Sequence, residues 1–428
     1  AYEVEAMQQL LEKAGYEIVP FEEGADIYLI NTCTVTNIAD RKSRQMLHKA
    51  KKMNPDAIVV ATGCYVQTDT QKLEADSAVD LILGNNQKKQ IVEALEEYEK
   101  EHAKKVKVIE INKTKEYEDL SIGYTAEHVR AYIKVQDGCN QFCTYCIIPY
   151  ARGRVRSRKI AEVLEEVRTL AARGYKEVVL TGIHLSSYGL DFPKEERESL
   201  LSLIQAVHEV DGIARIRLGS LEPRIITEEF MEGISALPKV CPHFHLSLQS
   251  GCDRTLKNMN RRYSAPEYAE KCELIRRFYP APALTTDVIV GFPMETEEDF
   301  EDSYEFVKNI HFYETHIFKY SRRQGTKAAA MDGQLTEAVK AQRSEKMLKL
   351  HEIRAKEYET AMIGRTLELL LEEEVEIGGK TYFMAHSKEY VRAVIEKTDA
   401  HKVNDLVKAK AVDFADEHVL LAICEDLY

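Results

Sequence analysis

Three cysteines stand close together in the segment VQDGCNQFCTYCIIPYARG, with the spacing C-x3-C-x2-C. Cys139, Cys143 and Cys146 can hold three irons of a [4Fe–4S] cube, whereas ordinary electron-transfer cubes take four cysteines. The fourth iron then stays open to a small molecule, as an enzyme needs if it binds and reductively cleaves S-adenosylmethionine (SAM). A zinc site normally has a fourth Cys or His close by, and the next histidine is His184. The spacing therefore predicts a cluster that binds SAM.

The overall composition is that of a globular protein with more than one domain. The chain has 428 residues, of which 44% are hydrophobic and 30% charged, so two or three domains are expected. No apolar run approaches the roughly 18 residues of a membrane helix, and the first residues do not resemble a signal peptide. Nine cysteines without an export signal are typical of a reducing compartment. We therefore expect a cytoplasmic protein with no membrane partner.

A basic run follows the cysteine loop directly. The net charge of −13 argues weakly against a nucleic-acid partner, but Arg152, Arg154, Arg156 and Arg158 are concentrated in one short segment. Local charge matters more than the sum, and arginines in such a run can bind phosphates. We therefore expect RNA contacts from Arg154, Arg156 and Arg158, whereas Arg152 is a candidate SAM contact.

The first hundred residues alternate helical segments with short apolar runs. DIYLINTC, AIVVATGC and VDLILGNN are typical of parallel strands in a sheet covered on both faces. Two of these runs end at Cys33 and Cys64, at the strand ends where ligands bind in open α/β sheets. The charged stretch from about 100 to 128 is expected to form a linker or a peripheral hairpin.

Six strand-like runs follow from residue 129, separated by helical stretches. They are VRAYIKV, EVVLTGI, IARIRLG, HFHLSL, LTTDVIVG and THIFKY. Six βα units predict a partial (β/α)6 barrel with a lateral opening, and functional residues are expected on the loops after the strands. The candidate SAM contacts there are Thr181, His184, Ser220, Glu222, Gln249, Ser250, Asp287 and Gly291. About half of these polar residues are expected only to cap helices or form turns.

Beyond Gly364 the chain consists of short β runs without helical periodicity. Five or so short strands predict a small antiparallel barrel, a type often used to bind RNA. The fold class is therefore α/β, with a doubly wound parallel sheet, a partial barrel and a small β-barrel in that order.

Four motifs make the chain resemble the radical-SAM methylthiotransferases. They are DGCNQFCTYCIIPYARG, NTCTVT, ATGCYVQ and LSLQSG. The resemblance implies a methylthiotransferase domain over 1–125, a radical-SAM domain over 126–362 and an RNA-binding TRAM domain over 363–428. The segments LSLQSGCDRTLKNMNRRY and TTDVIVGFPMETEEDF most resemble the branch that acts on N6-threonylcarbamoyladenosine in tRNA.

The resemblance also implies a second, auxiliary [4Fe–4S] cluster held by three cysteines. Cys33 and Cys64 match the second and third ligands, and the first is expected in a strand just before Ala1. Our interpretation is that the sequence omits a short stretch with that strand; alternatively, the first cysteine is absent.

The implied reaction has two stages. A SAM molecule methylates a sulfur on the auxiliary cluster, and a 5′-deoxyadenosyl radical removes hydrogen from C2 of the modified adenine, which then receives the methylthio group. No catalytic carboxylate is assigned. The implied partners are a tRNA anticodon stem-loop, an electron donor such as flavodoxin or ferredoxin, and a sulfur donor.

Three alternatives remain open. Two are methylthiotransferases that act on isopentenyladenosine in tRNA or on an aspartate of a ribosomal protein. The third is a non-enzymatic Fe–S protein that binds RNA.

Overall fold

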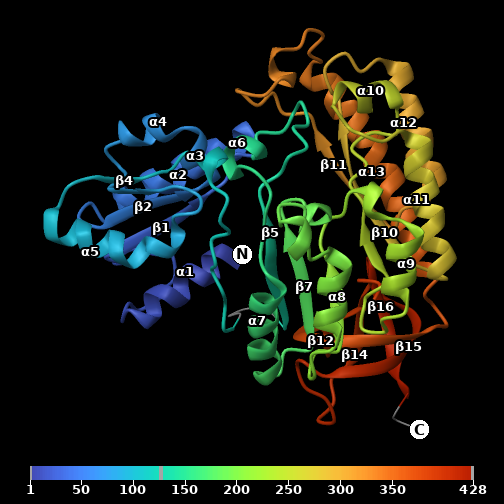
Figure 1. The fold of residues 1–428 in the computed structure, drawn as a ribbon. Coiled ribbons are helices and arrows are strands. Elements are labelled where there is room, and N and C mark those ends of the chain that lie inside the picture. The colour runs from blue at the N-terminus through green and yellow to red at the C-terminus, as the bar shows by residue number, and fades with distance from the viewer. Residues whose placement is uncertain (1, 125–128, 426–428) are drawn as a thin grey trace.

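A parallel sheet forms the first part of the protein. The computed structural model describes residues 2–124 and 129–425, and Figure 1 shows this sheet beside the upper part of a larger α/β region. The strands, in spatial order, are β1 (Ile27–Thr32), β2 (Ile58–Gly63), β3 (Leu81–Leu83) and β4 (Lys105–Lys107). Their pairing is parallel throughout.

Helices cover both faces of this sheet, as predicted from its apolar strands. The helices are α1 (Tyr2–Lys13), α2 (Asn37–Met53), α3 (Cys64–Thr68), α4 (Thr70–Glu74) and α5 (Ile91–Glu101). Leu47, Tyr65 and Leu73 pack on one face, and Met7 and Leu95 pack on the other. Because the central strands β2 and β3 are covered on both faces, they carry continuous apolar runs instead of an alternating pattern.

The segment from 100 to 124 is neither a free linker nor a hairpin. Its strand β4 pairs in parallel with β3, and Leu120 and Ile122 are buried against Tyr2 and Ala6 of α1. The strand sequence KVK lies at the sheet edge, and it carries too few apolar residues to be recognised from its pattern.

The predicted partial barrel is confirmed. Its parallel strands are β5 (Arg130–Asp137), β7 (Glu177–Gly182), β8 (Arg215–Leu218), β9 (His243–His245), β10 (Ala283–Val290) and β11 (Glu314–Lys319). The two component sheets are joined by bridges between Ile216 and Val240 and between Leu221 and Leu246. A two-residue strand, β6 (Arg156–Ser157), pairs antiparallel with β5 and was not predicted.

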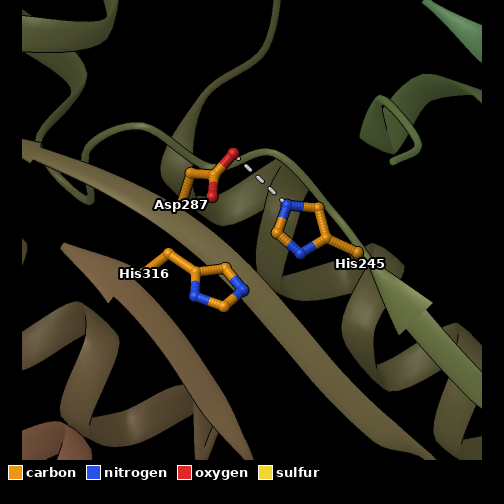
Figure 2. Close-up of side chains that lie close together, drawn as sticks. All are labelled: His245, Asp287 and His316. Atoms are coloured by element: carbon orange, nitrogen blue, oxygen red, sulfur yellow. Dashed lines mark ion pairs between the residues drawn. The ribbon is translucent and has the colours of Figure 1, made fainter. Parts of the chain in front are cut away.

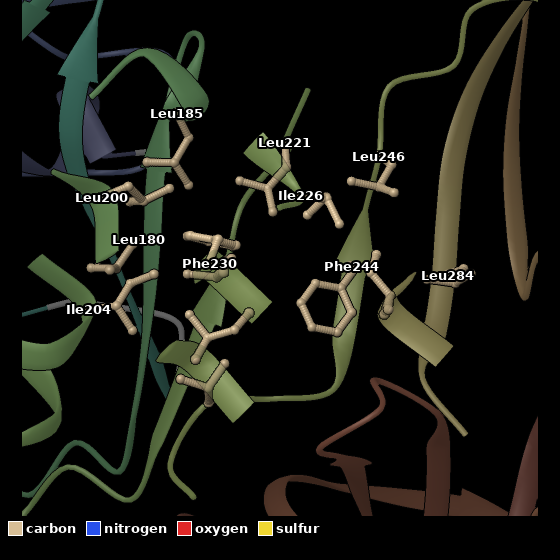
Figure 3. Close-up of a cluster of buried hydrophobic side chains, with 14 of the residues drawn as sticks. Leu180, Leu185, Leu200, Ile204, Leu221, Ile226, Phe230, Phe244, Leu246 and Leu284 are labelled. Carbon is tan, nitrogen blue, oxygen red and sulfur yellow. The ribbon is translucent and has the colours of Figure 1, made fainter. Parts of the chain in front are cut away.

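Helices pack on the outside of the barrel strands. They are α7 (Ile160–Ala172), α8 (Leu200–His208), α9 (Glu228–Ser235), α10 (Asp253–Asn258), α11 (Ala265–Phe278), α12 (Glu297–Ile310) and α13 (Glu337–Thr360). Ser264 and Thr296 begin α11 and α12 with capping boxes. Figure 3 shows Leu180, Phe244 and Leu284 among the buried side chains of this layer. Side chains alternate along a strand, so their neighbours point into the lumen.

A small closed β-barrel ends the chain. Its strands are β12 (Thr366–Ile377), β13 (Lys380–Ser387), β14 (Arg392–Glu396), β15 (Leu406–Asp416) and β16 (Val419–Cys424), in the order β12-β13-β14-β16-β15. The pairing is antiparallel except between β14 and β16, which are parallel. The predicted small antiparallel barrel is therefore confirmed, with this one parallel pair.

The small barrel packs against the amino ends of the (β/α) strands, at the bottom of Figure 1. Arg217 of β8 is buried and donates to the carbonyl of Lys388 at 2.9 Å. Two arginines contact the ring of Tyr390: its centroid is 4.8 Å from Cζ of Arg130 and 4.7 Å from Cζ of Arg217. This contact places the small barrel at the opposite end of the strands from the cysteine loop.

Among the described residues, no helix combines the length and the apolar character that a membrane crossing requires.

Candidate functional site

The three-cysteine loop lies at the carboxyl end of β5. Gly138 begins it with a φ of +71°, and a Cβ there would lie 1.9 Å from the carbonyl oxygen of Arg154, so only glycine fits. The amide of Cys139 donates to the carbonyl of Gly153 at 3.0 Å, and the amide of Thr144 donates to that of Met259 at 3.0 Å. These bonds fix the loop against its neighbours at both ends.

The environment of these thiols suits a cationic metal cluster. All three are free thiols at the edge of the barrel. Burial, together with the other two cysteines, raises the pKa of Cys146 to about 12, and burial also raises the pKa of Cys139. Three crowded thiolates need positive charge, which bound iron supplies. Arg261 adds a donor, with Nη1 3.3 Å from Sγ of Cys143. The donor set fits a [4Fe–4S] cube with one open iron.

Cys33 and Cys64 follow neighbouring strands. Thr32 of β1 pairs with Gly63 of β2, so the next residue of each strand lies at the same edge of the sheet. Gly63 has a φ of +100°, and a Cβ there would lie 2.5 Å from the carbonyl oxygen of Thr32. This turn lets Cys64 begin α3 directly. Cys33 is exposed and Cys64 is buried.

One arginine connects the two groups of cysteines, because it belongs to the helix after the cysteine loop and contacts Cys64. Arg152 ends α6 (Ile148–Arg152), which begins two residues after Cys146. Its Nε lies 3.1 Å from Sγ of Cys64. Asn85 also reaches this sulfur, with Nδ2 at 3.7 Å, and donates to the carbonyl of Ala151 at 2.7 Å. The structure therefore brings the edge of the first sheet against the loop at the top of the barrel.

A buried charge network holds this junction. Glu3 of α1 accepts from Lys88 and Lys134, each at 2.7 Å, and pairs with Arg152. Although burial acts against it, the charges of Arg152, Lys134 and Lys88 hold the pKa of Glu3 well below its usual range. Asp137, 2.6 Å from Lys134, has its pKa lowered to about 2 by Lys134 and Arg152 despite its burial. Both carboxylates are therefore charged at neutral pH.

A second set of contacts anchors the region next to Cys33. Arg323, which follows β11, donates through Nε to the carbonyl of Thr34 at 3.0 Å and pairs with Asp40 at 3.1 Å. Asn37 donates to the carbonyl of Arg322 at 2.8 Å. The edge that carries both cysteines is thus attached to the barrel on two sides.

Four candidate SAM contacts lie at the carboxyl ends of β7 and β8: Thr181 is near the end of β7, and His184, Ser220 and Glu222 are on the loops that follow. The pKa of His184 is lowered to about 4 by burial and by Arg261 and Arg224, and its Nε2 has no hydrogen-bond partner among the described residues. Glu222 is buried and accepts from Arg224 at 2.6 Å. Thr181 donates to a strand carbonyl at 3.1 Å and Ser220 shares a hydrogen bond with Ser247. Their contact with SAM stays a prediction.

The other four candidates, Gln249, Ser250, Asp287 and Gly291, lie after β9, within β10 and after β10, and each already contacts other protein groups. Ser250 accepts from the amide of Cys252, a turn role, and Gln249 has a φ of +73° and bridges to β10. Gly291 has a φ of +72°, and a Cβ there would lie 2.4 Å from the side chain of Lys340. Asp287 pairs with His245 in the lumen.

The prediction that the arginine run binds phosphate is wrong for two of its members. Arg156 and Arg158 are fully or nearly fully buried. Arg156 pairs with Asp137 at 3.5 Å, and Arg158 pairs with Glu166. Arg154 is exposed and stacks on Phe142 at 4.6 Å, so it alone remains available. Arg152, the fourth member, lies beside Cys64.

The sequence alone assigned no site role to Glu3, Asn85 or Arg261. Glu3 lies in an ordinary helical pattern, and its partners are 85 to 149 residues away in the chain. No local signal marks such a residue. The NRRY sequence around Arg261 shows a basic cluster but not its contact with Cys143.

Comparisons with known proteins agree with this geometry. The radical SAM superfamily matches residues 133–307, and the uncharacterized protein family UPF0004 matches residues 1–84. The threonylcarbamoyladenosine tRNA methylthiotransferase MtaB of Bacillus subtilis is 40% identical over 96% of this chain and 90% of its own length. MtaB of Aquifex aeolicus is 43% identical over 87% and 90%. The tRNA-2-methylthio-N(6)-dimethylallyladenosine synthase of Moorella thermoacetica is 38% identical over 86% and 83%.

A solved structure shares the fold. The radical SAM methyltransferase TsrM of Kitasatospora setae superposes with a TM-score of 0.56 at 16% identity, over 74% of this chain and 70% of that one. Enzymes of this kind use SAM and [4Fe–4S] clusters, and the cysteine sites described above fit them. With identities of 38–43% over most of both chains, the protein belongs to the radical-SAM methylthiotransferase family.

Proposed function

We propose that this enzyme transfers a methylthio group to C2 of N6-threonylcarbamoyladenosine next to the anticodon of tRNA. Two relatives named for that nucleoside are 40% and 43% identical to the chain. The structural observation that carries the proposal is the contact of Arg152 with Cys64, 3.1 Å apart. It supports a reaction in which both cysteine sites serve one substrate, as methylthio transfer requires.

In this proposal, Cys139, Cys143 and Cys146 hold the cluster that binds SAM. Cys33 and Cys64 contribute to an auxiliary cluster. When bound, these groups supply radical cleavage of SAM and the sulfur that is transferred. The protein's own residues orient the cysteine ligands and shield the site. Arg261 and Arg152 donate hydrogen bonds to the cysteine sulfurs, as residues around metal ligands commonly do. The edge of the first sheet packs against α6, next to the cysteine loop, and this contact helps to keep water from a reactive carbon radical.

We propose the domain boundaries 1–125, 126–362 and 363–428, because each of the three sheet systems falls within one of these ranges.

The RNA contact is proposed around Arg154. This exposed arginine stacks on Phe142, and Phe142 contacts the exposed ring of Tyr150 at a centroid distance of 5.7 Å. A cation beside exposed aromatic rings suits an unstacked loop base and its phosphate. The patch lies on the cysteine loop and on α6, so RNA bound there reaches the reacting atoms.

The test is direct. Anaerobically reconstituted protein is incubated with SAM, a reductant, and anticodon stem-loop RNA that carries either threonylcarbamoyladenosine or dimethylallyladenosine. The proposal predicts that the first RNA gains the mass of one methylthio group in place of hydrogen. Modification of the second RNA alone would favour the function named for the Moorella relative.

The physiological reaction also needs an electron donor, for which a flavodoxin or ferredoxin is proposed, and a sulfur donor. Replacing the chemical reductant with either protein in the same assay tests the first of these.

A further inference from the structure

Three ionisable side chains meet inside the partial barrel. His245 of β9, Asp287 of β10 and His316 of β11 lie on neighbouring strands, and Figure 2 shows them turned toward one another. Nε2 of His245 is 3.3 Å from Oδ2 of Asp287. The two imidazole rings are stacked with centroids 5.6 Å apart. One polar atom from each residue lies within 4.8 Å of the other two.

Strand geometry places this cluster on the lumen side. Phe244, Leu246 and Val288 belong to the buried layer beneath the outer helices, so the alternate residues of β9 and β10 face the other way. Asp287 pairs directly with His316 in the register of β10 and β11. The three side chains therefore share one level of the lumen.

The cluster lies below the cysteine loop and is reached from the side. Asp287 is three residues before the end of β10, which is about 10 Å along the strand. His316 is on β11, the edge strand of its sheet, and is exposed. Further down, the ring of Tyr390 from the small barrel contacts the ring of His243, with centroids 5.2 Å apart.

Its hydrogen-bonding capacity is only partly used by the protein. Nδ1 of His245 is 3.0 Å from Oγ1 of Thr285, which fixes the ring. Within residues 2–124 and 129–425, the carboxylate of Asp287 has only His245 as a polar neighbour at bonding distance, and the ring of His316 has no hydrogen bond. A half-enclosed site with spare donors and acceptors is suited to a polar ligand.

We propose that His245, Asp287 and His316 form the subsite for the polar arm on N6 of the substrate base. This rests on the proposed function and specifies how the arm is recognised. A base whose C2 faces the cysteine loop places N6 and its substituent further from that loop, toward this level of the lumen. The ring of His316 donates to a carboxylate or hydroxyl oxygen of the threonylcarbamoyl arm, Asp287 accepts one of the arm's N–H or O–H groups, and His245 holds Asp287 in place.

The same polar side chains should discriminate against a substrate whose N6 arm is apolar. A dimethylallyl arm offers no hydrogen bond, so once bound it would cover the half-buried Asp287 and the ring of His316 without pairing them. Sites built to hydrogen-bond a substrate discriminate against analogues that lack the partner by about 10⁴-fold. The donor set of two histidines and one carboxylate could also hold a divalent transition metal. Metal analysis in the experiment below distinguishes such a metal site from the proposed subsite.

The experiment compares kcat/KM for two stem-loop RNAs, one with threonylcarbamoyladenosine and one with dimethylallyladenosine, within a single protein preparation. The ratio of the two values does not depend on the fraction of enzyme that carries clusters. His316→Phe removes the ring donors and keeps an aromatic ring of similar size. His48→Phe, on the exposed surface of α2, is the matched control.

We expect His316→Phe to lower the ratio by about tenfold to a hundredfold, the effect of one or two lost hydrogen bonds to a charged group, and His48→Phe to leave it unchanged. An unchanged ratio in His316→Phe overturns the subsite while leaving the proposed function intact. Wild-type protein that modifies neither RNA, or only the dimethylallyl RNA, overturns the proposed function and the subsite with it. One equivalent of zinc or manganese, bound by wild type and lost in His316→Phe, overturns the subsite in favour of a metal site.

Discussion

The two cysteine sites of this protein are built in different ways. Cys139, Cys143 and Cys146 lie on one loop, and their spacing alone brings them together. Cys33 and Cys64 are 31 residues apart and meet only because β1 and β2 are adjacent parallel strands. The first site is therefore local, whereas the second depends on the fold of a whole sheet.

The sites also differ in what surrounds them. The loop cysteines have one arginine donor, Arg261, from the same barrel. Cys64 has two donors, and one of them, Arg152, comes from the barrel and belongs to a buried charge network that includes Glu3. The second site is thus part of an interface between two sheets. A mutation in the second site should therefore alter the interface between the first sheet and the barrel as well as the metal content of the site.

The largest expected effect comes from breaking the local site. In Cys143→Ala the loop keeps only two ligands, so iron content should fall from about eight to about four per chain, and 5′-deoxyadenosine formation should fall to background. Iron analysis and chromatography of the SAM products check this. Cys272→Ala, in the buried core of α11, should keep both. A Cys143→Ala protein that still cleaves SAM would contradict the assignment.

Breaking the second site should separate two activities. Cys64→Ala leaves the loop cysteines in place, so the reduced protein should still form 5′-deoxyadenosine from SAM. It should form no methylthio product, because in the proposed reaction the auxiliary site supplies the transferred sulfur. Mass analysis of the RNA and of the SAM products in one reaction measures both. Loss of the two activities together would mean that the sites are not separable.

The interface between the two cysteine sites can be weakened without substituting a cysteine. Arg152→Met leaves Glu3 and Asp137 with one fewer cation in a buried setting, and removing one partner of such a pair costs about 3–5 kcal/mol of stability. Denaturant unfolding under anaerobic conditions measures it. Arg154→Met, an exposed arginine on the same segment, should cost less than about 0.5 kcal/mol. Equal losses in the two variants would argue against the network.

The smallest expected effect concerns pH and the loop after β7. His184 is neutral in the folded protein down to about pH 4 because burial lowers its pKa, whereas in the unfolded chain it titrates near 6.5. Between these values the unfolded state binds more protons, so stability falls as the pH falls. From pH 7 to pH 5 this residue should cost about 2 kcal/mol. His184→Gln should remove that part of the pH dependence of the unfolding free energy, measured by denaturant unfolding. If the slope of the unfolding free energy against pH is unchanged in the variant, His184 is not its source.

Local features of the sequence predicted more of this protein than distant contacts did. The three-cysteine spacing, the apolar strands of the first sheet and the six strands of the barrel could all be predicted, because each depends on nearby residues. Arg156 and Arg158 could not be placed, because a basic run looks the same whether solvent or distant carboxylates surround it. Their partners Asp137 and Glu166 meet them only after β5, β6 and α7 have packed.

The auxiliary site shows the same limit. Its cysteines could be located at two strand ends, but Asn85 and Glu3 could not be connected to it, because their contacts cross between sheets. The lumen cluster around His316 was missed for a related reason. Its three residues come from three strands, and each strand carries other polar residues as well, so no local pattern singles these three out.

The most direct test of the whole account follows one hydrogen atom. Stem-loop RNA carrying threonylcarbamoyladenosine with deuterium at C2 is incubated with reduced enzyme and SAM, and the 5′-deoxyadenosine is analysed by mass spectrometry. The account predicts that 5′-deoxyadenosine gains one deuterium and that the same RNA gains a methylthio group. Methylthio-RNA formed alongside 5′-deoxyadenosine without deuterium would contradict it.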